Sequence, residues 1–484
     1  MAKQLRNDVA RGVAWALGEK VASILLQAGV GILVARLLAP EDYGVMALLA
    51  VFATLSLVVV DSGFSQTLIR AKEPTPSDYR SVFTLNLLLA FLLYGLLVAV
   101  APALARYFEQ PALARIAPVL FLLLPLNALC VIQQTLCARQ FRFDTLSKVV
   151  FLSSALSGVV ALVMAFAGCG VWSLVGQRLV AMGAKAAMLW WIGDWRPSGR
   201  FDGASLRRMT PYSLRMLMTD LINTLYNNIS QLFVGKIYST QTLGYYNQGQ
   251  KLKDLPVLAI LQSVQNVTFP ALSKIRDERE KFAESYRQLL AVVSFVVYPV
   301  MVGLIAVAPE FFALLLGEKW MPTVPYFEIL CLSGLFMPLS VIAYNVLKSQ
   351  SDGRIVVRLE VVKKVAMTLV LVYTIPRGVV AIAWGVVVMA LLEWAINLVA
   401  ASRYTALSLA QALGAHLPAV LLSGVMFLGV RLFKQTIGVE FSLFALLSSQ
   451  ILLGVLLYAL LALLIRPRAL RVLFEVVKGM RGSR

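Results

Sequence analysis

The sequence predicts an all-α protein that crosses a membrane many times. Of its 484 residues, 59% are hydrophobic and only 14% are charged, and the mean hydropathy is +0.79. A soluble protein needs far more polar surface than this composition provides. Apolar runs of about 20 residues, the length at which a helix spans a bilayer, recur along the whole chain. Together these observations define the fold class as a polytopic helical membrane protein.

The apolar runs number fourteen, and short loops separate them. They lie at 12–37, 41–63, 81–103, 113–136, 147–168, 170–192, 211–236, 243–270, 286–308, 324–347, 358–375, 379–401, 414–434 and 442–465. The basic loops between them fix an orientation. With the N-terminus in the cytoplasm, the cytoplasmic side holds more than three times as many Lys and Arg as the opposite side. This bias predicts that both termini are cytoplasmic.

A polar stripe marks the seventh run, Pro211–Lys236. Its members Asp220, Asn223, Asn227 and Gln231 are spaced by three and four residues, so a helix would present them on one face. Polar side chains are costly when they face lipid. The stripe is therefore expected to line a hydrated interior, as in a transporter.

The same stripe recurs two hundred positions earlier in the first run. The equivalent residues are Lys20, Ser23, Gln27 and Gly31, and Gly44 likewise corresponds to Gly244. This internal repeat predicts two related halves around one central cavity. The expected division is 1–208 for the first six helices, 209–404 for the next six, and 405–484 for two further helices with a basic cytoplasmic tail. The Gly- and Pro-containing stretch Asp194–Arg208 is predicted to be the loop between the halves.

Ionisable residues inside a membrane segment are functional candidates by default. The cations that lie deepest are the expected substrate-binding residues: Lys20, Arg178, Lys185, Lys251 and Lys253. Glu19, Asp61 and Asp220 are the carboxylates that could couple transport to an ion. Lys363 and its neighbours lie within two turns of a helix end, where they can reach the headgroups. The alternative role for each deep charge is an ion pair that only holds helices together.

Other classes of function find little support in the sequence. The four cysteines form no CxxC motif and have no histidine nearby, and the single histidine, His416, is expected to pack or to donate a hydrogen bond at the interface, so neither a metal nor another cofactor is expected. No catalytic residues are predicted. The net charge of +19 is explained by positive loops facing the cytoplasm, which excludes nucleic acid as the expected partner.

Several motifs resemble one family of membrane proteins. LLAPEDYG at 37–44, FRFDTLSK at 141–148, LGYYNQGQKLKDLP at 243–256 and TFPALSKI at 268–275 are similar to bacterial polysaccharide exporters of the MOP superfamily. The nearest resemblance is to Wzx-like lipid-linked oligosaccharide flippases and colanic-acid-type exporters. It covers at least the first 280 residues and agrees with fourteen helices over the rest.

The resemblance implies a transporter of the bacterial inner membrane rather than an enzyme. Its expected cargo is an undecaprenyl-diphosphate-linked oligosaccharide, moved by alternating access to the periplasmic leaflet for O-antigen, capsule or exopolysaccharide biosynthesis. Membrane lipids, and a polysaccharide polymerase with its export machinery, are the further partners considered. One alternative is a drug or cation antiporter of the same superfamily. The other is a membrane glycosyltransferase or polymerase, which the short loops and the scarcity of acidic residues disfavour.

Overall fold

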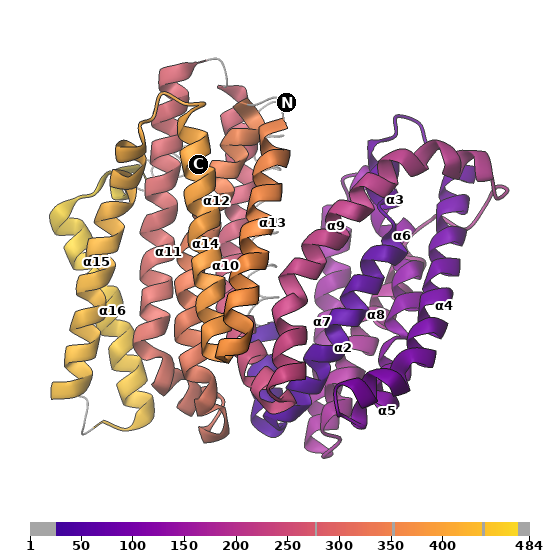
Figure 1. The fold of residues 1–484 in the computed structure, drawn as a ribbon, viewed down its shortest axis with the longest axis horizontal. Helices are drawn as coiled ribbons and strands as arrows, with labels where there is room; N and C mark the ends of the chain where they lie inside the picture. Colours follow the sequence, from indigo (N-terminus) through magenta and orange to yellow (C-terminus); the bar gives the residue numbers. More distant parts are fainter. Residues whose placement is uncertain (1–25, 276–277, 351–353, 438–440, 473–484) are drawn as a thin grey trace. The chain divides into compact units, whose positions relative to one another are not determined.

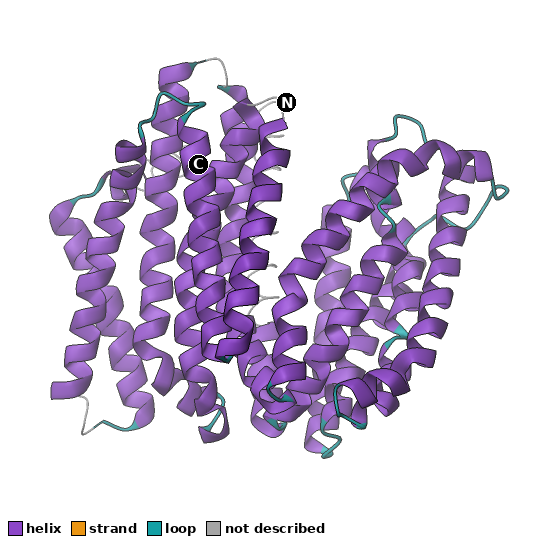
Figure 2. Cartoon of the chain, viewed as in Figure 1, coloured by secondary structure: helices purple, strands orange, loops and turns teal. Residues whose placement is uncertain are grey.

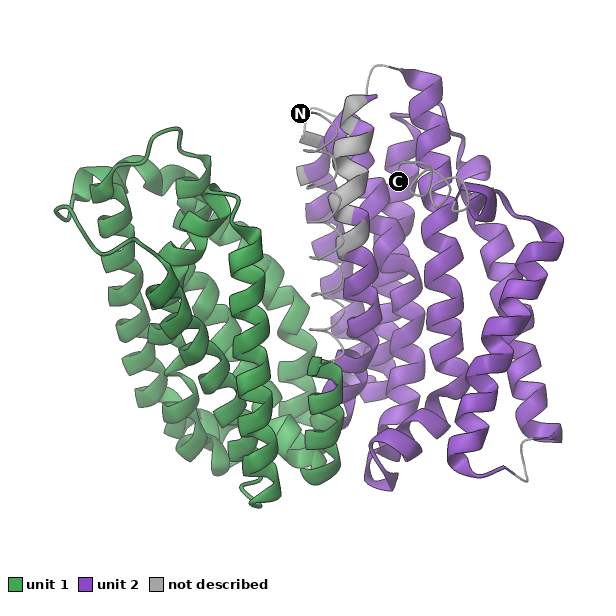
Figure 3. Ribbon diagram, turned by 180° about the vertical axis from the view of Figure 1, so that it is seen from behind, with its two compact units in different colours: residues 1–244 green, residues 245–484 purple. Residues whose placement is uncertain are grey.

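The computed structural model describes residues 26–275, 278–350, 354–437 and 441–472. Every regular element in these ranges is helical (Figure 2). Contacts divide the chain into two compact units, Met1–Gly244 and Tyr245–Arg484, which Figure 3 shows in different colours.

The first unit holds a short apolar helix, Leu26–Leu37, followed by a series of helices labelled in Figure 1. These are α2 (Pro40–Asp61), α3 (Phe64–Arg70), α4 (Pro76–Tyr107), α5 (Ala112–Leu120), α6 (Leu123–Arg139), α7 (Phe143–Phe166), α8 (Val171–Ile192), α9 (Gly203–Ile237) and the start of α10 (Thr240–Lys274). One of its cores packs Phe64, Leu68, Val82, Phe83 and Ile132 from α3, α4 and α6.

The break between α2 and α3 depends on backbone conformation. Ser62 and Gly63 both adopt positive φ, of 53° and 67°, which ends α2 and turns the chain directly into α3. A Cβ on Gly63 would collide with the backbone of Ser213 in α9. The glycine therefore allows both the turn and the close approach of α9.

The stretch between α8 and α9 corrects part of the predicted inter-half loop. Residues 194–202 form a loop, but α9 already begins at Gly203, inside the range expected to be irregular. Asp202 is the reason, because its carboxylate accepts hydrogen bonds from the Ser205 hydroxyl (2.7 Å) and from the Ala204 and Ser205 amides. These bonds, the hydroxyl bond first, lower the pKa of Asp202. The predicted division at 208/209 falls within α9, and its repeat remains a prediction.

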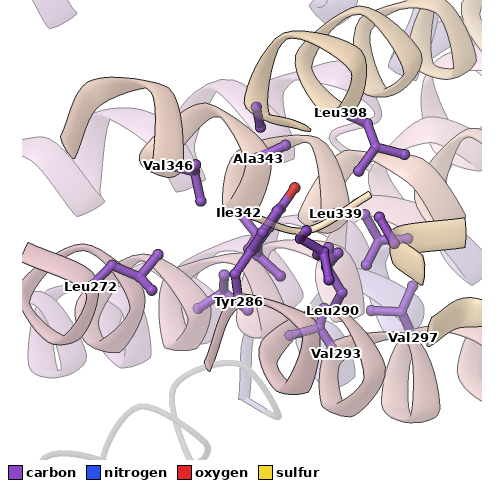
Figure 4. Close-up of a cluster of buried hydrophobic side chains, with 14 of the residues drawn as sticks. Leu272, Tyr286, Leu290, Val293, Val297, Leu339, Ile342, Ala343, Val346 and Leu398 are labelled. Carbon is purple, nitrogen blue, oxygen red and sulfur yellow. The ribbon is translucent and has the colours of Figure 1, made fainter. Parts of the chain in front are cut away.

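The second unit continues α10 and adds the remaining helices. They are α11 (Arg279–Leu315), the 3₁₀ turn η1 (Glu318–Thr323), α12 (Val324–Gln350), α13 (Arg354–Thr374), η2 (Ile375–Arg377), α14 (Val379–Ser402), α15 (Leu409–Thr436) and α16 (Leu443–Ile465). The core of this unit lies between α11, α12 and α14. Figure 4 shows Tyr286, Leu290 and Val297 of α11 packed against Leu339, Ile342 and Val346 of α12, with Leu398 of α14 beside them.

The described residues contain nine helical segments that are long and apolar enough to cross a membrane. They are Pro40–Arg70, Pro76–Tyr107, Ala112–Arg139, Phe143–Phe166, Arg279–Leu315, Glu318–Gln350, Val379–Ser402, Leu409–Thr436 and Leu443–Ile465. Each coincides with a predicted run, so the multi-pass helical class is confirmed. Four further predicted runs are also helical, but they are too polar to count among these apolar segments. They lie at 170–192, 211–236, 243–270 and 358–375 and form α8, α9, α10 and α13. The first run, 12–37, lies mostly outside the described residues.

Candidate functional site

A polar cavity of about 220 Å³ lies inside the first unit, between the Leu26–Leu37 helix, α7 and α8. Its polar lining consists of Gln27, Ser154, Ser157, Gln177 and Arg178. The Leu26–Leu37 helix approaches α7 closely because Gly158 has no side chain; a Cβ there would lie 2.9 Å from Val30 Cγ2. Sequence positions about 150 residues apart therefore share one small cavity.

Arg178 is the charged group of this cavity. It lies two turns into α8, and its exposed side chain lines the cavity. Within the described ranges, its guanidinium makes no hydrogen bond or ion pair. A deep charge is normally neutralised by a partner, because desolvation without one is costly. An unpaired guanidinium among amide and hydroxyl groups is therefore suited to an incoming anion.

A second cavity of the first unit is acidic. It measures about 360 Å³, and Asp61, Asn127, Asp220, Asn223 and Thr224 supply its polar lining. Asp61 accepts a hydrogen bond from the Ser65 hydroxyl, and Asp220 accepts one from Gln66 Nε2 at 3.3 Å. Two carboxylates with amides and hydroxyls between them can hold a proton or a small cation. The structure thus separates the predicted cationic and acidic groups of this unit into two cavities.

Helix α3 is the element that positions the acidic cavity. Besides the Gln66–Asp220 bond, the hydroxyls of Thr67 and Ser213 lie 2.7 Å apart, and the Arg70 guanidinium lies 4.8 Å above the Tyr212 ring. These contacts run along one face of α9.

The C-terminal end of α3 is capped by Arg139 of α6. Its guanidinium donates to the carbonyl of Leu68, and to those of Ile69 (3.3 Å), Ala71 (2.7 Å) and Lys72 (3.4 Å). A cation at this point satisfies carbonyls that the last helical turn leaves without partners.

The other predicted site residues are distributed more widely. Lys185 is partly buried, lies about two turns beyond Arg178 on α8, and does not line the cavity of Arg178. On α9, Asn227 is exposed and Gln231 is buried, and neither lines the acidic cavity. Glu19, Lys20 and Ser23 lie outside the described residues.

The two predicted cations of α10 differ sharply from each other. Lys251 is exposed, whereas Lys253 is only 3% exposed and forms an ion pair with the adjacent Asp254, with Nζ and Oδ1 2.5 Å apart. The geometry of Lys253 thus matches the structural alternative that the sequence left open.

Sequence reasoning missed a buried ionic cluster in the second unit. Lys363 of α13 is only 6% exposed, and its Nζ lies 2.5 Å from Glu360 and 3.6 Å from Glu393 of α14. The ring of Tyr344 in α12 lies 5.1 Å away. Lys363 was expected to reach the headgroups, so this expectation was wrong: contacts among α12, α13 and α14 bury it instead. In the first unit, the cavity residues that the sequence analysis missed are Gln177, Ser154 and Asn127.

The described residues contain no group of three or more His, Cys, Asp or Glu side chains that could hold a metal ion. The cationic cavity holds one charged side chain and the acidic cavity holds two carboxylates, and amides and hydroxyls line both.

The fold identifies the class of protein. It is similar to that of the lipid II flippase MurJ in an inward closed conformation, with a TM-score of 0.74 and 14% identity over 94% of this chain and 99% of that one. It is also similar to an inward-facing multidrug resistance MATE family transporter of the MOP superfamily, with a TM-score of 0.58 and 15% identity over 79% and 95% of the two chains. The molecule is a multi-pass helical membrane protein with a MurJ- and MATE-like fold.

Sequence similarity assigns the chain to a particular family. The profile of the polysaccharide biosynthesis protein family matches residues 33–325, and the chain belongs to this family. It is 26% identical to the teichuronic acid biosynthesis protein TuaB of Bacillus subtilis over 57% of this chain and 58% of TuaB, so the match spans little more than half of that relative. It is 24% identical to the lipopolysaccharide biosynthesis protein WzxC of Escherichia coli over 68% of each chain. The chain is a Wzx-like polysaccharide biosynthesis protein with a fold similar to those of MurJ and MATE transporters, and the predicted resemblance is confirmed.

Proposed function

We propose that this protein flips an undecaprenyl-diphosphate-linked oligosaccharide repeat unit from the cytoplasmic to the periplasmic leaflet of the bacterial inner membrane. The glycan would serve a surface polysaccharide such as O-antigen, capsule or exopolysaccharide. Membership of a polysaccharide biosynthesis family and a flippase-like fold support this cargo class.

The observation that carries the proposal is Arg178, which lines the polar cavity of the first unit and has no hydrogen-bond or ion-pair partner among the described residues. A diphosphate offers several acceptor oxygens and negative charge, and a guanidinium binds such groups through two parallel hydrogen bonds. Gln27 and Gln177 can add amide donors beside it. Lys185, Lys251 and Lys20, the last of which lies outside the described residues, remain further candidates for contact with the diphosphate. Lys253 would contribute only after its pairing with Asp254 is broken.

Coupling to an ion is assigned to the acidic cavity. Asp61 and Asp220 would take up a proton or a sodium ion from one side and release it to the other, while the cargo headgroup occupies the cationic cavity. Asn223 supplies an amide oxygen at the same place. Transport by alternating access requires that a loaded cavity open to each side in turn.

The membrane arrangement that this function needs has fourteen crossings. We infer that α8, α9, α10 and α13 cross the membrane in addition to the nine apolar segments, their polar residues facing hydrated interiors rather than lipid. The first predicted run would complete the set, with two related groups of six helices, 1–208 and 209–404, followed by 405–484. Both termini would be cytoplasmic, as the basic loops predict.

The acidic cavity also favours a second candidate, a drug or cation antiporter of the same superfamily. Two carboxylates facing Asn127 and Asn223 would suit an organic cation as well as a coupling ion. The cationic cavity then has no evident cargo, which is why the flippase is preferred.

The deciding experiment is deletion of the gene in the native host, with extraction of the lipid-linked saccharides. The flippase predicts build-up of a diphosphate-linked repeat unit on the cytoplasmic leaflet and loss of surface polysaccharide, both reversed by the wild-type gene. A normal surface coat without such an intermediate, in a host that lacks a second exporter, contradicts the proposal. Reduced efflux of organic cations in the same strain would instead favour the antiporter.

A further inference from the structure

A pocket of about 280 Å³ lies in the second unit, far along the chain from the cavities described above. It sits where α11 begins and the chain emerges from α16. Helices α11, α15 and α16 pack against one another and lie side by side in Figure 1. The lining residues used below are Glu284, Arg287, Gln288, Phe295, Ala415, Pro418 and Arg468.

A sharp turn after α16 builds one wall of this pocket. Arg466 ends the helix in the left-handed conformation, with φ of 49°, and Pro467 begins a new helical turn. Ala469 is then only 4% exposed, and Leu470 packs onto the cluster of Leu422, Met426 and Tyr458. The returning chain is thus anchored, and it holds Arg468 at the pocket.

The pocket carries two arginines and one carboxylate. Neither Arg287 nor Arg468 makes an ion pair in the part of the chain that the structure describes. The Glu284 carboxylate is engaged by Gln288 Nε2 at 3.1 Å, on the same helix. Two guanidinium groups against one occupied carboxylate leave the pocket positive, and arginine pairs suit a phosphate group.

The rest of the surroundings is apolar. Phe295, Ala415 and Pro418 line the pocket, and α15 and α16 expose a row of large apolar side chains nearby, including Leu413, Leu417, Leu463, Leu464 and Ile465. Both helices are apolar enough to span a membrane, and Arg468 follows the end of α16 by three residues. The positive pocket therefore lies at a membrane edge, where a phosphate would sit above lipid chains.

We propose that this pocket binds the headgroup of an anionic phospholipid, with Arg287 and Arg468 on its phosphate and its acyl chains along the apolar faces of α15 and α16. The site fixes the end of α16 to the start of α11 in a membrane that contains anionic lipid. It does not depend on the cargo assigned above, because it uses other residues and an ordinary membrane lipid.

The test measures lipid retention by the full-length protein purified in a non-ionic detergent. Phosphatidylglycerol, phosphatidylcholine or inorganic phosphate is titrated in, and bound species are counted by native mass spectrometry. Wild-type protein should retain phosphatidylglycerol in preference to phosphatidylcholine. Arg287→Gln and Arg468→Gln should each weaken phosphatidylglycerol binding about tenfold, by loss of one charge-assisted contact. Arg468→Lys should weaken it less.

The matched control is Arg471→Gln, an exposed arginine on the same short turn that does not line the pocket. It should leave retention unchanged. Equal losses in Arg468→Gln and Arg471→Gln, or equal retention of the two lipids, would overturn the site. Displacement of phosphatidylglycerol by millimolar inorganic phosphate would show that the pocket binds a free anion and not a lipid. Arg287→Gln could lower the yield of folded protein. Arg468 is exposed and lies after the end of α16, so Arg468→Gln still tests whether the pocket binds the lipid.

Discussion

Gly44 of α2 and Gly244 of α10 lie where two helices cross at backbone distance. A Cβ on Gly44 would overlap the carbonyl of Thr240, and a Cβ on Gly244 would overlap the carbonyl of Pro40. Positions 40 and 44 thus meet positions 244 and 240 in a reciprocal contact, as expected for a local two-fold relationship. We take this reciprocity as support for the proposed repeat, whose two copies carry the glycines at equivalent places.

Alanine at either glycine should therefore disrupt the first unit. Gly44→Ala or Gly244→Ala places a methyl group inside a backbone carbonyl, which cannot rotate away as a side chain would. The expected cost is at least about 3 kcal/mol, the upper range for overpacked sites. It would appear as a lower apparent melting temperature, or as loss of monodisperse protein, in detergent.

The matched control is Gly29→Ala in the Leu26–Leu37 helix, where a Cβ meets nothing within 4 Å. Alanine in a helix is favoured over glycine by about 0.5–1 kcal/mol, so this variant should be as stable as the wild type or slightly more stable. Equal behaviour of all three variants would show that the crossing tolerates a side chain.

Removal of the Arg178 charge should abolish transport without loss of folded protein. Arg178→Gln keeps a polar side chain in the cavity but removes the charge that we assign to the diphosphate. A charge-assisted hydrogen bond contributes about 1.5–3 kcal/mol, so transport should fall at least tenfold. Surface polysaccharide in the complemented deletion strain is the measurement, with membrane insertion checked by immunoblot.

Arg200→Gln, in the exposed loop before α9, is the control for that substitution. It removes the same charge at a position that lines neither cavity, and transport should remain normal. Full transport by Arg178→Gln would remove this residue from cargo binding.

The sequence predicted individual residues of the site better than their grouping. Arg178 and Gln27 follow from depth and from the polar stripe, since charges and amides in apolar runs stand out in any sequence. Their meeting in one cavity depends on the Gly158–Val30 contact, which brings the Leu26–Leu37 helix onto α7. No local pattern encodes that distance.

Lys253 and Lys363 show the opposite limit of sequence reasoning. Lys253 was a cargo candidate because of its depth, but the side chain is buried and paired with its neighbour Asp254. Lys363 was dismissed because it lies near a helix end, yet Glu393 comes to it from another helix. Depth along one helix predicts the cost of a charge, whereas its role depends on which neighbouring helix supplies a counter-ion.

Neutralising Asp220 tests ion coupling with little structural change. Asp220→Asn keeps an oxygen that can accept the 3.3 Å hydrogen bond from Gln66, so α3 should stay in place on α9. Coupled transport should lose its dependence on the ion gradient, because an amide takes up no proton and has no negative charge to hold a cation. The measurement is the uptake rate of a labelled lipid-linked saccharide in proteoliposomes, with and without an imposed gradient.

The control for this substitution is Thr219→Val, which removes an exposed hydroxyl next to Asp220 but outside the cavity. It should behave as the wild type. Unchanged rate and gradient dependence in Asp220→Asn would exclude this residue from coupling.

Arg139 should stabilise the acidic cavity from a distance, through α3. Its guanidinium holds the carbonyls at the end of that seven-residue helix, and α3 in turn supplies Gln66 to Asp220. Arg139→Gln removes the charge and offers at most two donors for these four carbonyls, so the first unit should lose about 2 kcal/mol or more of stability.

The comparison variant for Arg139 is Arg142→Gln, three residues on at a partly exposed position after α6. It removes a like charge without touching α3 and should melt within about 1 °C of the wild type, as surface substitutions usually do. Cysteine accessibility provides the second readout: a cysteine placed at Gln66 should react faster with a water-soluble maleimide in the Arg139→Gln background, because an uncapped α3 moves away from α9. If stability and labelling rate are both unchanged by Arg139→Gln, α3 is held by its contacts with α9 alone, and Arg139 has no part in positioning the cavity.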